Sequence, residues 1–494
     1  MQDVRKKIMS HYSLNNRPLL SPKSDKISVS KILWVICLVL AFIGLTTPNP
    51  LETSLGCLIW PVLFSLLWRP GEPPALLFAA SFQMIQVIVP VINANLAGET
   101  LEQNFGQELS LAFYLGILSI LALAYGMKLA VGNSPVISLI DQEKSASELK
   151  FSRLAIAYLG TFVLSSLMTV LAFGNPAFTQ LLLSLASLRW LVIFLIVWNG
   201  FRDLKFSLLS LIIVIWEIII GMTGFFSGFK QIIFIVLVVY GATSLKVKQL
   251  LRPQVLILMV LLLLLATYWQ SVKGDYRNYV NGGTQTQTVR VSLADRLNYH
   301  TNSANNINDK QLEDGFNALL SRLGYLKFFA GSIRTVPNAV PYQNGKLWSE
   351  AISALIPRAF FPDKPVLDDS KRTNEFSGIE AAGADKGTSI SIGYVGESYI
   401  DFGVPFMFAP IFALGCFWGW LYRFITNVGS IPLLGLAGAT TILLNSAVFF
   451  ESSNVKIFPA GVILLLVYSM VLRFFGKNIW LWLTCKSKRM FEKF

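Results

Sequence analysis

Histidine, cysteine and charged residues are scarce in this sequence. Of its 494 residues only two are His and four are Cys, and 14% are charged, whereas ordinary soluble domains contain about 25% charged residues. The cysteines match neither a disulfide framework nor a zinc-ligand spacing; they are Cys37, Cys57, Cys416 and Cys485. These shortages exclude a disulfide-stapled secreted domain and a zinc module, and the shortage of His disfavours a His-dependent acyltransferase.

Apolar residues fill 54% of the chain and fall into long runs. Runs of roughly 17–25 apolar residues are long enough to cross a bilayer as helices. The pattern predicts twelve spans, of which the second is the weakest because it directly follows a Pro-rich turn. The spans are residues 32–47, 51–68, 75–96, 109–131, 153–172, 179–198, 206–223, 229–244, 254–272, 403–424, 431–450 and 457–475. We therefore predict an all-α polytopic membrane protein with about twelve transmembrane helices.

Basic residues predict how these spans are oriented. About 24 Lys and Arg residues lie in the two tails and in every second loop, whereas the alternate short loops hold only Lys230 and Lys456. Segments rich in Lys and Arg stay in the cytoplasm. Both termini are therefore expected in the cytoplasm, and the long polar stretch of residues 273–402 on the opposite side of the membrane.

This pattern divides the chain into five parts. Residues 1–31 are expected to form a basic cytoplasmic tail, residues 32–272 nine transmembrane helices, and residues 273–402 a large extracytoplasmic loop. Residues 403–475 form three more helices, and residues 476–494 an aromatic and basic tail that suits the cytoplasmic interface. No cleavable signal is expected, because no small-residue cleavage site follows a short apolar core.

The net charge of +13 does not indicate a nucleic-acid partner. The large loop holds 14 basic and 14 acidic side chains, so the positive excess lies on the cytoplasmic side. There it is mainly a topology signal, with some attraction to anionic lipids. Membrane lipid, and no nucleic acid, is the expected partner.

Short helices are expected within the loop. Residues 276–310, rich in Asn, Gln, Thr and Gly, are predicted to be irregular. Apolar residues recur at helical spacing in residues 315–336 and again in residues 347–356. Residues 362–388 are predicted to be polar loop, and residues 393–402 lead straight into the next span. The short helices are apolar enough to lie on a membrane.

Two charged residues fall inside predicted spans. Arg189 and Glu217 both lie about 15 Å from the cytoplasmic boundary, at 1.5 Å per residue. Charges within the hydrocarbon are paired or functional. Opposite charges at equal depth on adjacent helices favour an ion pair, and a substrate-facing role for Arg189 is the alternative.

Cations in and around the loop are candidate ligands of an anion. Arg binds phosphate oxygens through two parallel hydrogen bonds, and Lys acts as a point charge. The loop cations near amphipathic segments are Arg322, Arg334, Arg358 and Lys364. At the outer helix ends, Lys230, Glu451 and Lys456 are either interfacial charges or the rim of an outward-facing site. Any one of these Arg residues could instead be solvated or salt-bridged, but as a set the loop cations favour anion binding, and a diphosphate-linked lipid would need several such donors.

Glu397 and Asp401 are the candidate carboxylates. They are four residues apart and share one face if the segment is helical. Such a carboxylate is a suitable general base for a sugar hydroxyl, and a charge stabilised by a helix dipole is the alternative. His300 is the only His outside the N-terminal tail and is expected to be incidental.

Two motifs late in the loop resemble a known family. They are Ile356-Pro357-Arg358 with Phe361-Pro362-Asp363-Lys364-Pro365, and Gly396-Glu397-Ser398-Tyr399-Ile400-Asp401-Phe402-Gly403. This pattern resembles the bacterial oligosaccharide repeat-unit polymerases, the Wzy-type O-antigen polymerases, which carry a Pro-Arg, a Lys-Pro and a Gly-Glu-x-Tyr-x-Asn-Phe-Gly before a late helix. Asp401 stands where Asn is usual. The layout of about twelve spans with one large late loop is also similar.

The resemblance implies a glycosyltransferase-C-like enzyme of the bacterial inner membrane, working without metal or cofactor. It would transfer a glycan from undecaprenyl diphosphate to another lipid-linked repeat unit at the outer face. Arg358, Arg322 and Arg334 would hold the diphosphate, an electrostatic role that needs no metal. Glu397 would activate the acceptor hydroxyl or organise the arginines. Further substrate contacts are expected from Lys364, Tyr399, Asp401 and Arg189. A chain-length regulator and a flippase would be partner proteins.

Two other functions are alternatives to the polymerase. An O-antigen ligase-type transferase uses the same chemistry on another acceptor, but usually has a loop His close to Arg residues, and His300 is poorly placed for that. A lipid-linked oligosaccharide flippase or other transporter would be expected to show internal repeats with interrupted helices, and we find no convincing repeat. The polymerase is the favoured prediction.

Overall fold

The structure is a computed structural model that describes residues 22–133, 139–175, 177–202, 204–225, 228–244, 253–284, 289–356, 368–381, 383, 389–429 and 431–486. Within these ranges every regular element is a helix. The prediction of an all-α chain is therefore confirmed for the described part.

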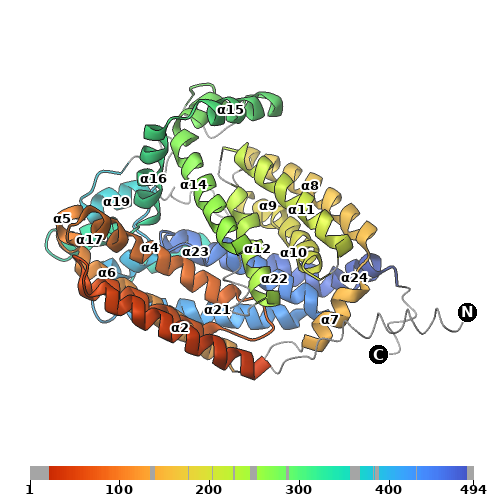
Figure 1. Ribbon diagram of the computed structural model, residues 1–494, viewed down its shortest axis with the longest axis horizontal. Helices are drawn as coiled ribbons and strands as arrows, with labels where there is room; N and C mark the ends of the chain where they lie inside the picture. The colour runs from red at the N-terminus through yellow and green to blue at the C-terminus, as the bar shows by residue number, and fades with distance from the viewer. Residues whose placement is uncertain are drawn as a thin grey trace, which may run out of the picture.

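The helices before the large loop form most of the bundle (Figure 1). They are α2 (Pro22–Gly44), α3 (Pro50–Leu67), α4 (Ala75–Ala97), α5 (Leu101–Phe105), α6 (Leu109–Val131), α7 (Leu139–Glu148), α8 (Phe151–Gly174), α9 (Thr179–Ala186), α10 (Leu188–Gly200), α11 (Leu204–Met222), α12 (Phe229–Ser244) and α14 (Pro253–Val280).

The remaining helices belong to the loop and the C-terminal part. The loop contains α15 (Leu293–Asn306), α16 (Asp309–Leu323), α17 (Lys327–Thr335), α18 (Lys346–Ala354), α19 (Asp369–Ser377) and α20 (Tyr394–Phe402). The C-terminal part contains α21 (Phe408–Val428), α22 (Pro432–Ser446), α23 (Asn454–Met470), a π-helical turn (Val471–Phe475) and α24 (Gly476–Thr484).

Each of the twelve predicted apolar spans overlaps helix, although the span 179–198 is divided between α9 and α10 and the helix of the span 403–424 begins only at Phe408. In the described part, eight helices are long and apolar enough to cross a membrane, and four shorter apolar helices accompany them. Many large apolar side chains of α2, α8, α11 and α14 remain exposed on the outside of the bundle. An apolar outer surface is what a lipid environment requires, so the fold indicates a polytopic membrane protein.

Loops from alternate helix ends lie at opposite ends of the bundle. Figure 1 shows α5, α17 and α19 at one end of the long axis, and α7 and α24 at the other. At the second end the backbone N–H of Lys150 donates to the Leu483 carbonyl (3.1 Å), and Lys486 pairs with Glu148 (2.6 Å). We call the end that carries the loop helices the loop end.

Several predictions within the loop were wrong. Much of residues 276–310 is helical and not irregular, because α14 continues to Val280 and α15 occupies residues 293–306, whereas the described residues 281–284 and 289–292 between them are not helical. The residues predicted as one helix, 315–336, are divided between α16 and α17 at Gly324. Residues 362–388 contain α19, and residues 393–402 form the separate helix α20, so the next bundle helix starts at Phe408 instead of Gly403.

The contacts of His300 explain why the polar residues of α15 form a helix. Its Nδ1 lies 3.1 Å from the Tyr268 hydroxyl and its Nε2 lies 3.2 Å from the Met222 carbonyl oxygen. The ring also packs on Tyr276 at 4.5 Å between centroids. These contacts hold α15 against α14, and burial lowers the pKa of His300. The residue therefore anchors α15 to its neighbours.

The helices α6 and α21 pack closely against each other. Gly415 and Gly419 are spaced by four, as in small-xxx-small membrane interfaces. A Cβ at Gly415 would overlap the carbonyl oxygen of Leu123, and one at Gly419 would overlap that of Met127. The backbones can approach this closely only because glycine occupies both positions.

We expect Gly415→Ala to lower the unfolding midpoint in detergent, because the added methyl group must push α6 and α21 apart. Overpacking of this kind costs about 1–3 kcal/mol. Gly160→Ala on α8 is the matched control, since a Cβ there meets nothing within 4 Å. Equal midpoints for the two variants would contradict the proposed close contact.

Candidate functional site

The buried helix α20 joins the large loop to the bundle. Its first residue, Tyr394, donates its backbone N–H to the Ser452 carbonyl (2.7 Å) and its hydroxyl to Gln83 of α4 (2.7 Å). Gly393 precedes it with a φ of 96°, and a Cβ there would lie 2.6 Å from the Phe450 carbonyl oxygen. The start of α20 is therefore held against the turn between α22 and α23.

Glu397 in the first turn of α20 caps a second helix. Its Oε2 accepts the backbone N–H of Asn454, the first residue of α23, at 2.6 Å. The N-cap residue of α23, Ser453, makes no side-chain cap of its own. A carboxylate at a helix N-terminus is favoured by the helix dipole. The other oxygen, Oε1, lies 3.9 Å from Nη1 of Arg372.

A buried polar cluster surrounds this carboxylate. We define it as Asp369 and Arg372 of α19, Glu397 of α20, and Asn454 of α23. Asp369 Oδ2 pairs with Lys456 (2.6 Å) and accepts from Ser453 (3.2 Å). Arg372 pairs through Nη2 with Glu350 of α18. Four helices from different parts of the loop and bundle therefore converge on Glu397.

The buried polar cluster contains polar atoms without hydrogen-bond partners. They are Nδ2 and Oδ1 of Asn454, Oδ1 of Asp369 and Nη1 of Arg372. Asn454 is 0% exposed and Asp369 3% exposed. Leaving a buried polar atom unpaired costs about 1–3 kcal/mol, so native proteins seldom keep such atoms together. Their concentration beside Glu397 makes this cluster the candidate site.

Burial dominates the protonation of Glu397. It raises the pKa of the carboxyl to about 8, against the hydrogen bond from the Asn454 N–H and the attraction of Arg372, both of which favour the ionised form. Asp369 and Asp401 add like charge. An acid with a pKa near the working pH can both accept and release a proton.

A cationic group lies beside the same turn. It consists of Lys230 of α12, Lys273 and Arg277 of α14, and Arg322 of α16, whose charges act on one another, and the carboxylate of Glu451 acts on Lys230 and Lys273. Arg322 makes two hydrogen bonds to Glu451, each 2.6 Å long. One carboxylate cannot balance four cations, so the group has an excess of positive charge that would attract an anion.

Tyr325 connects the cationic group to the buried polar cluster. Its ring lies 5.7 Å from the Arg322 guanidinium, and its hydroxyl donates to the Ser391 carbonyl (2.6 Å). Burial raises the pKa of Tyr325, and the charges of Glu451, Arg322 and Asp369 all act on it. The two sets of charges are therefore neighbours at the loop end, not separate sites.

A family described as a domain of unknown function, DUF8712, matches residues 108–435. The chain belongs to the DUF8712 family. The matched region runs from the start of α6 into α22 and includes the cationic group, Asp369, Arg372 and Glu397, whereas Glu451 and Asn454 follow it. The chain matched no curated protein and no solved structure.

Asp401, a predicted substrate ligand, caps another helix of the DUF8712 region. Its two oxygens accept the backbone N–H groups of Leu347 (3.0 Å) and Trp348 (2.9 Å) in the first turn of α18. Burial raises the pKa of Asp401. The residue is fully buried, so the structure gives it a positioning role for α18, which carries Glu350.

Tyr399 and Arg334 differ in exposure. The Tyr399 hydroxyl donates to the Val336 carbonyl (3.0 Å), and its ring packs between Phe329 and Tyr342. Arg334, at the end of α17, is exposed, and its guanidinium has no ion-pair partner among the described residues. Tyr399 therefore supports the packing of α20, and Arg334 lies at the surface.

Three further predicted residues remain. Arg358 and Lys364 fall outside the described residues. Arg189 of α10 pairs with Glu217 of α11 at 3.5 Å, and the Tyr158 hydroxyl donates to the same carboxylate at 2.7 Å. The predicted ion pair is confirmed.

The sequence did not reveal Asp369, Arg372 and Asn454. The first two lie in residues predicted as loop, although Asp368 is an N-cap signal, and its side chain does accept from the N–H groups of Ser370 and Lys371. That signal predicts α19 but not the contact of Arg372 with Glu397. In the described ranges, no group of three or more His, Cys, Asp or Glu side chains could hold a metal ion.

The raised pKa of Glu397 predicts how stability depends on pH. Between the unfolded pKa of about 4.3 and the folded value of about 8, the folded state binds more protons, so stability falls as pH rises. The fall is at most about 1.4 kcal/mol per pH unit. Glu397→Gln removes this titrating group. The free energy of unfolding of the variant, relative to that of the natural protein, should therefore increase from pH 5 to pH 8.

Unfolding midpoints in detergent across this range would measure the difference. Glu375→Gln on α19 is the control, because the Glu375 side chain is exposed and should leave the pH profile unchanged. A constant difference between Glu397→Gln and the natural protein would contradict the assigned protonation.

Proposed function

We propose that the protein is a membrane glycosyltransferase that polymerises lipid-linked oligosaccharide repeat units. One observation carries the proposal: Tyr325 lies between a group of four cations near Glu451 and the buried polar cluster around Glu397, which contains polar atoms without hydrogen-bond partners. Diphosphate needs several cationic donors, and transfer to a sugar hydroxyl needs a base close to them. The resemblance of residues 393–403 to the repeat-unit polymerases supports the same assignment.

The proposed donor is a glycan attached to undecaprenyl diphosphate, and the acceptor is a second lipid-linked repeat unit. An acceptor hydroxyl oxygen bonds to the anomeric carbon of the donor glycan, and the bond from that carbon to the diphosphate oxygen breaks. Undecaprenyl diphosphate leaves with the electron pair, and the hydroxyl proton passes to the Glu397 carboxylate. The glycan grows by one unit.

The cationic group is suited to the leaving diphosphate. Lys230, Lys273, Arg277 and Arg322 form a preorganised positive field, which stabilises charge that develops as the bond breaks. Arg358, Arg334 and Lys364 are the proposed further ligands on the strength of the sequence. Arg372 is proposed to position Glu397, since it bridges this carboxylate to Glu350.

The proposed setting is the bacterial inner membrane, with twelve spans, both termini in the cytoplasm and the loop end outside. The gathering of α5, α17 and α19 at the end opposite α7 and α24 supports this orientation (Figure 1). The proposed architecture is glycosyltransferase-C-like. The proposed chemistry uses no cofactor, and a chain-length regulator and a flippase are proposed partners.

The ligase-type alternative would use a loop His beside arginines. Both ring nitrogens of His300 already have partners in Tyr268 and Met222. This engagement favours the polymerase over the ligase.

In cells, Glu397→Gln and Arg358→Ala are expected to abolish long glycan chains while the protein level stays intact. Glu397→Gln removes the proton acceptor without changing size, and Arg358→Ala removes a phosphate donor. A gel ladder of the surface polysaccharide measures chain length, with Glu375→Gln as the control. Normal ladders would refute the site, and loss of all surface glycan would indicate a ligase or flippase instead.

In a purified assay with undecaprenyl-diphosphate-linked repeat units, Lys273→Ala and Arg322→Ala should each raise KM for the lipid-linked donor about tenfold or more. A hydrogen bond to a charged group contributes roughly 1.5–3 kcal/mol. Lys310→Ala, at the opposite end of α16, is the matched control because Lys310 is exposed and remote from the cationic group. An unchanged KM in both variants would exclude the cationic group as the diphosphate site.

A further inference from the structure

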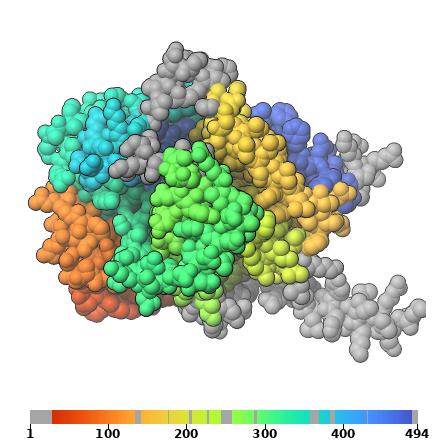
Figure 2. Space-filling model, turned by 90° about the horizontal axis from the view of Figure 1, so that it is seen from above, coloured from red at the N-terminus to blue at the C-terminus, as the bar shows by residue number. Residues whose placement is uncertain are grey.

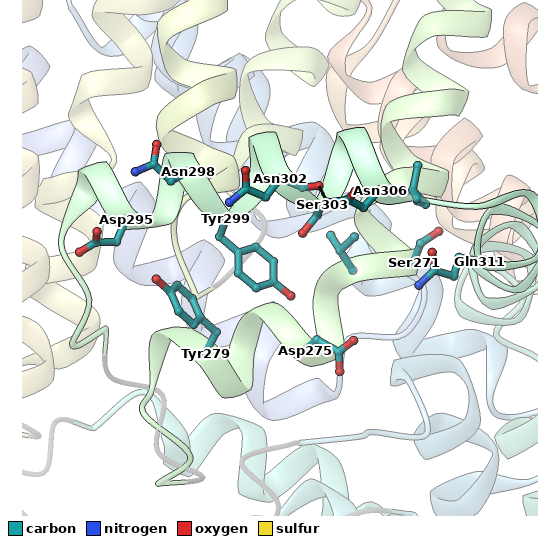
Figure 3. A pocket seen from close by; sticks show the side chains of 12 residues that line it. Ser271, Asp275, Tyr279, Asp295, Asn298, Tyr299, Asn302, Ser303, Asn306 and Gln311 are labelled. Atoms are coloured by element: carbon teal, nitrogen blue, oxygen red, sulfur yellow. Dashed lines mark hydrogen bonds between the residues drawn. The ribbon is translucent and has the colours of Figure 1, made fainter.

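A cavity of about 440 Å³ lies between the outer part of α14, α15 and the start of α16. We call it the α15 groove. Figure 3 shows its side chains projecting from α15 on one side and α14 on the other. Figure 2 shows the green segment of α14 and α15 on the face turned to the viewer, beside the teal and cyan loop helices. The volume is within the range of small-molecule sites.

Residues at helical spacing on α14 and on α15 form the two walls of the α15 groove. On α14, Asp275 and Tyr279 are four residues apart and lie on one face. On α15, Asn298 and Asn302 repeat at the same interval. The rings of Tyr279 and Tyr299 stack between the walls, with centroids 4.9 Å apart and planes at 27°. The contacts of His300 with α14 hold the walls in register.

The lining of the α15 groove suits a ligand rich in hydroxyl groups. Asparagine amides and serine hydroxyls both donate and accept hydrogen bonds, as sugar hydroxyls do. Tyrosine rings present flat apolar faces beside a polar tip, which matches the alternating C–H and O–H surfaces of a sugar ring. The groove therefore combines the two kinds of contact that a saccharide needs.

The charged residues that line the α15 groove limit which saccharides could bind there. The groove contains the carboxylates Asp275 and Asp295, and none of its lining residues in the described part is basic. An acidic sugar or a phosphate would meet only like charge there. Neutral sugars avoid that repulsion, and the ammonium of an amino sugar would be attracted to the carboxylates.

The helix α14 separates the α15 groove from the cationic group. Lys273 and Arg277 are also four residues apart, but they alternate with Asp275 and Tyr279, so they lie on the other side of the helix. One helix thus presents cations on one face and a saccharide-type lining on the other. An extended glycan joined to a diphosphate could contact both.

We propose that the α15 groove is a saccharide subsite for neutral or amino-sugar residues of the glycan, distinct from the diphosphate site. The proposal deepens the proposed function and rests on it for the identity of the glycan. The subsite holds the chain beyond the reacting sugar, so its loss weakens retention of the glycan without removing the chemistry.

The test is direct binding of free glycan to the full-length protein in detergent. The probe is the repeat-unit oligosaccharide of cells that express the protein, released from diphosphate by mild acid and titrated in a calorimeter. The double variant Asn298→Ala/Asn302→Ala is expected to weaken binding at least tenfold. Asn305→Ala is the matched control, because it is an exposed Asn on the same helix that does not line the groove.

Arg322→Ala should bind this phosphate-free probe as the natural protein does, and the double variant should shorten glycan chains without abolishing them. Unchanged affinity in the double variant, no binding of the probe at millimolar concentration, or a repeat unit made only of acidic sugars would each overturn the subsite. Failure of the proposed function would be recognised separately, because cells with Glu397→Gln would then still show a normal gel ladder of surface polysaccharide.

Discussion

Two carboxylates on one short helix hold the loop end together. Glu397 accepts the N–H of Asn454 and caps α23, and Asp401 accepts the N–H groups of Leu347 and Trp348 and caps α18. Unsatisfied N–H groups at a buried helix start are costly, so each cap fixes the position of a whole helix. Because the two carboxylates are four residues apart, α20 alone sets the distance between a bundle helix and a loop helix. The arrangement of Glu350, Arg372 and Asp369 around α20 depends on these two contacts.

The same contacts leave the candidate site incompletely satisfied. Both oxygens of Asp401 are engaged, whereas Oε1 of Glu397 has only Arg372 at 3.9 Å. Asn454 donates its backbone N–H to Glu397 but leaves its own side-chain amide without a partner. A rigid frame with unsatisfied polar groups at its centre is what binding of a polar substrate requires, because the frame prevents those groups from pairing with one another. The packing of the bundle offsets the energetic cost.

The two faces of α14 carry side chains of different charge, because of their positions along the helix. One face carries Lys273 and Arg277 toward Glu451, and the other carries Asp275 and Tyr279 into the α15 groove. Positive charge is thereby concentrated where a diphosphate would lie, and the saccharide-type surface is kept free of it. The loop as a whole is neutral, so in the proposed function this separation, and not net charge, would provide selectivity. Tyr325 lies at the point where the cationic group meets the buried polar cluster.

The sequence alone determined the twelve apolar helices and the Arg189–Glu217 pair, because both follow from local hydrophobicity and helical rise. It also singled out Glu397 through its motif. Only the tertiary structure decided that polar residues form α15 and α19, since contacts such as those of His300 stabilise helices that lack an apolar stripe. Only the tertiary structure brought Arg372, Asp369 and Asn454 to Glu397 and gathered Lys230, Lys273 and Arg277 beside Arg322. Periodicity in the sequence reports on residues within one helix. Contacts between residues far apart in the chain depend on how the helices pack, so periodicity does not predict them.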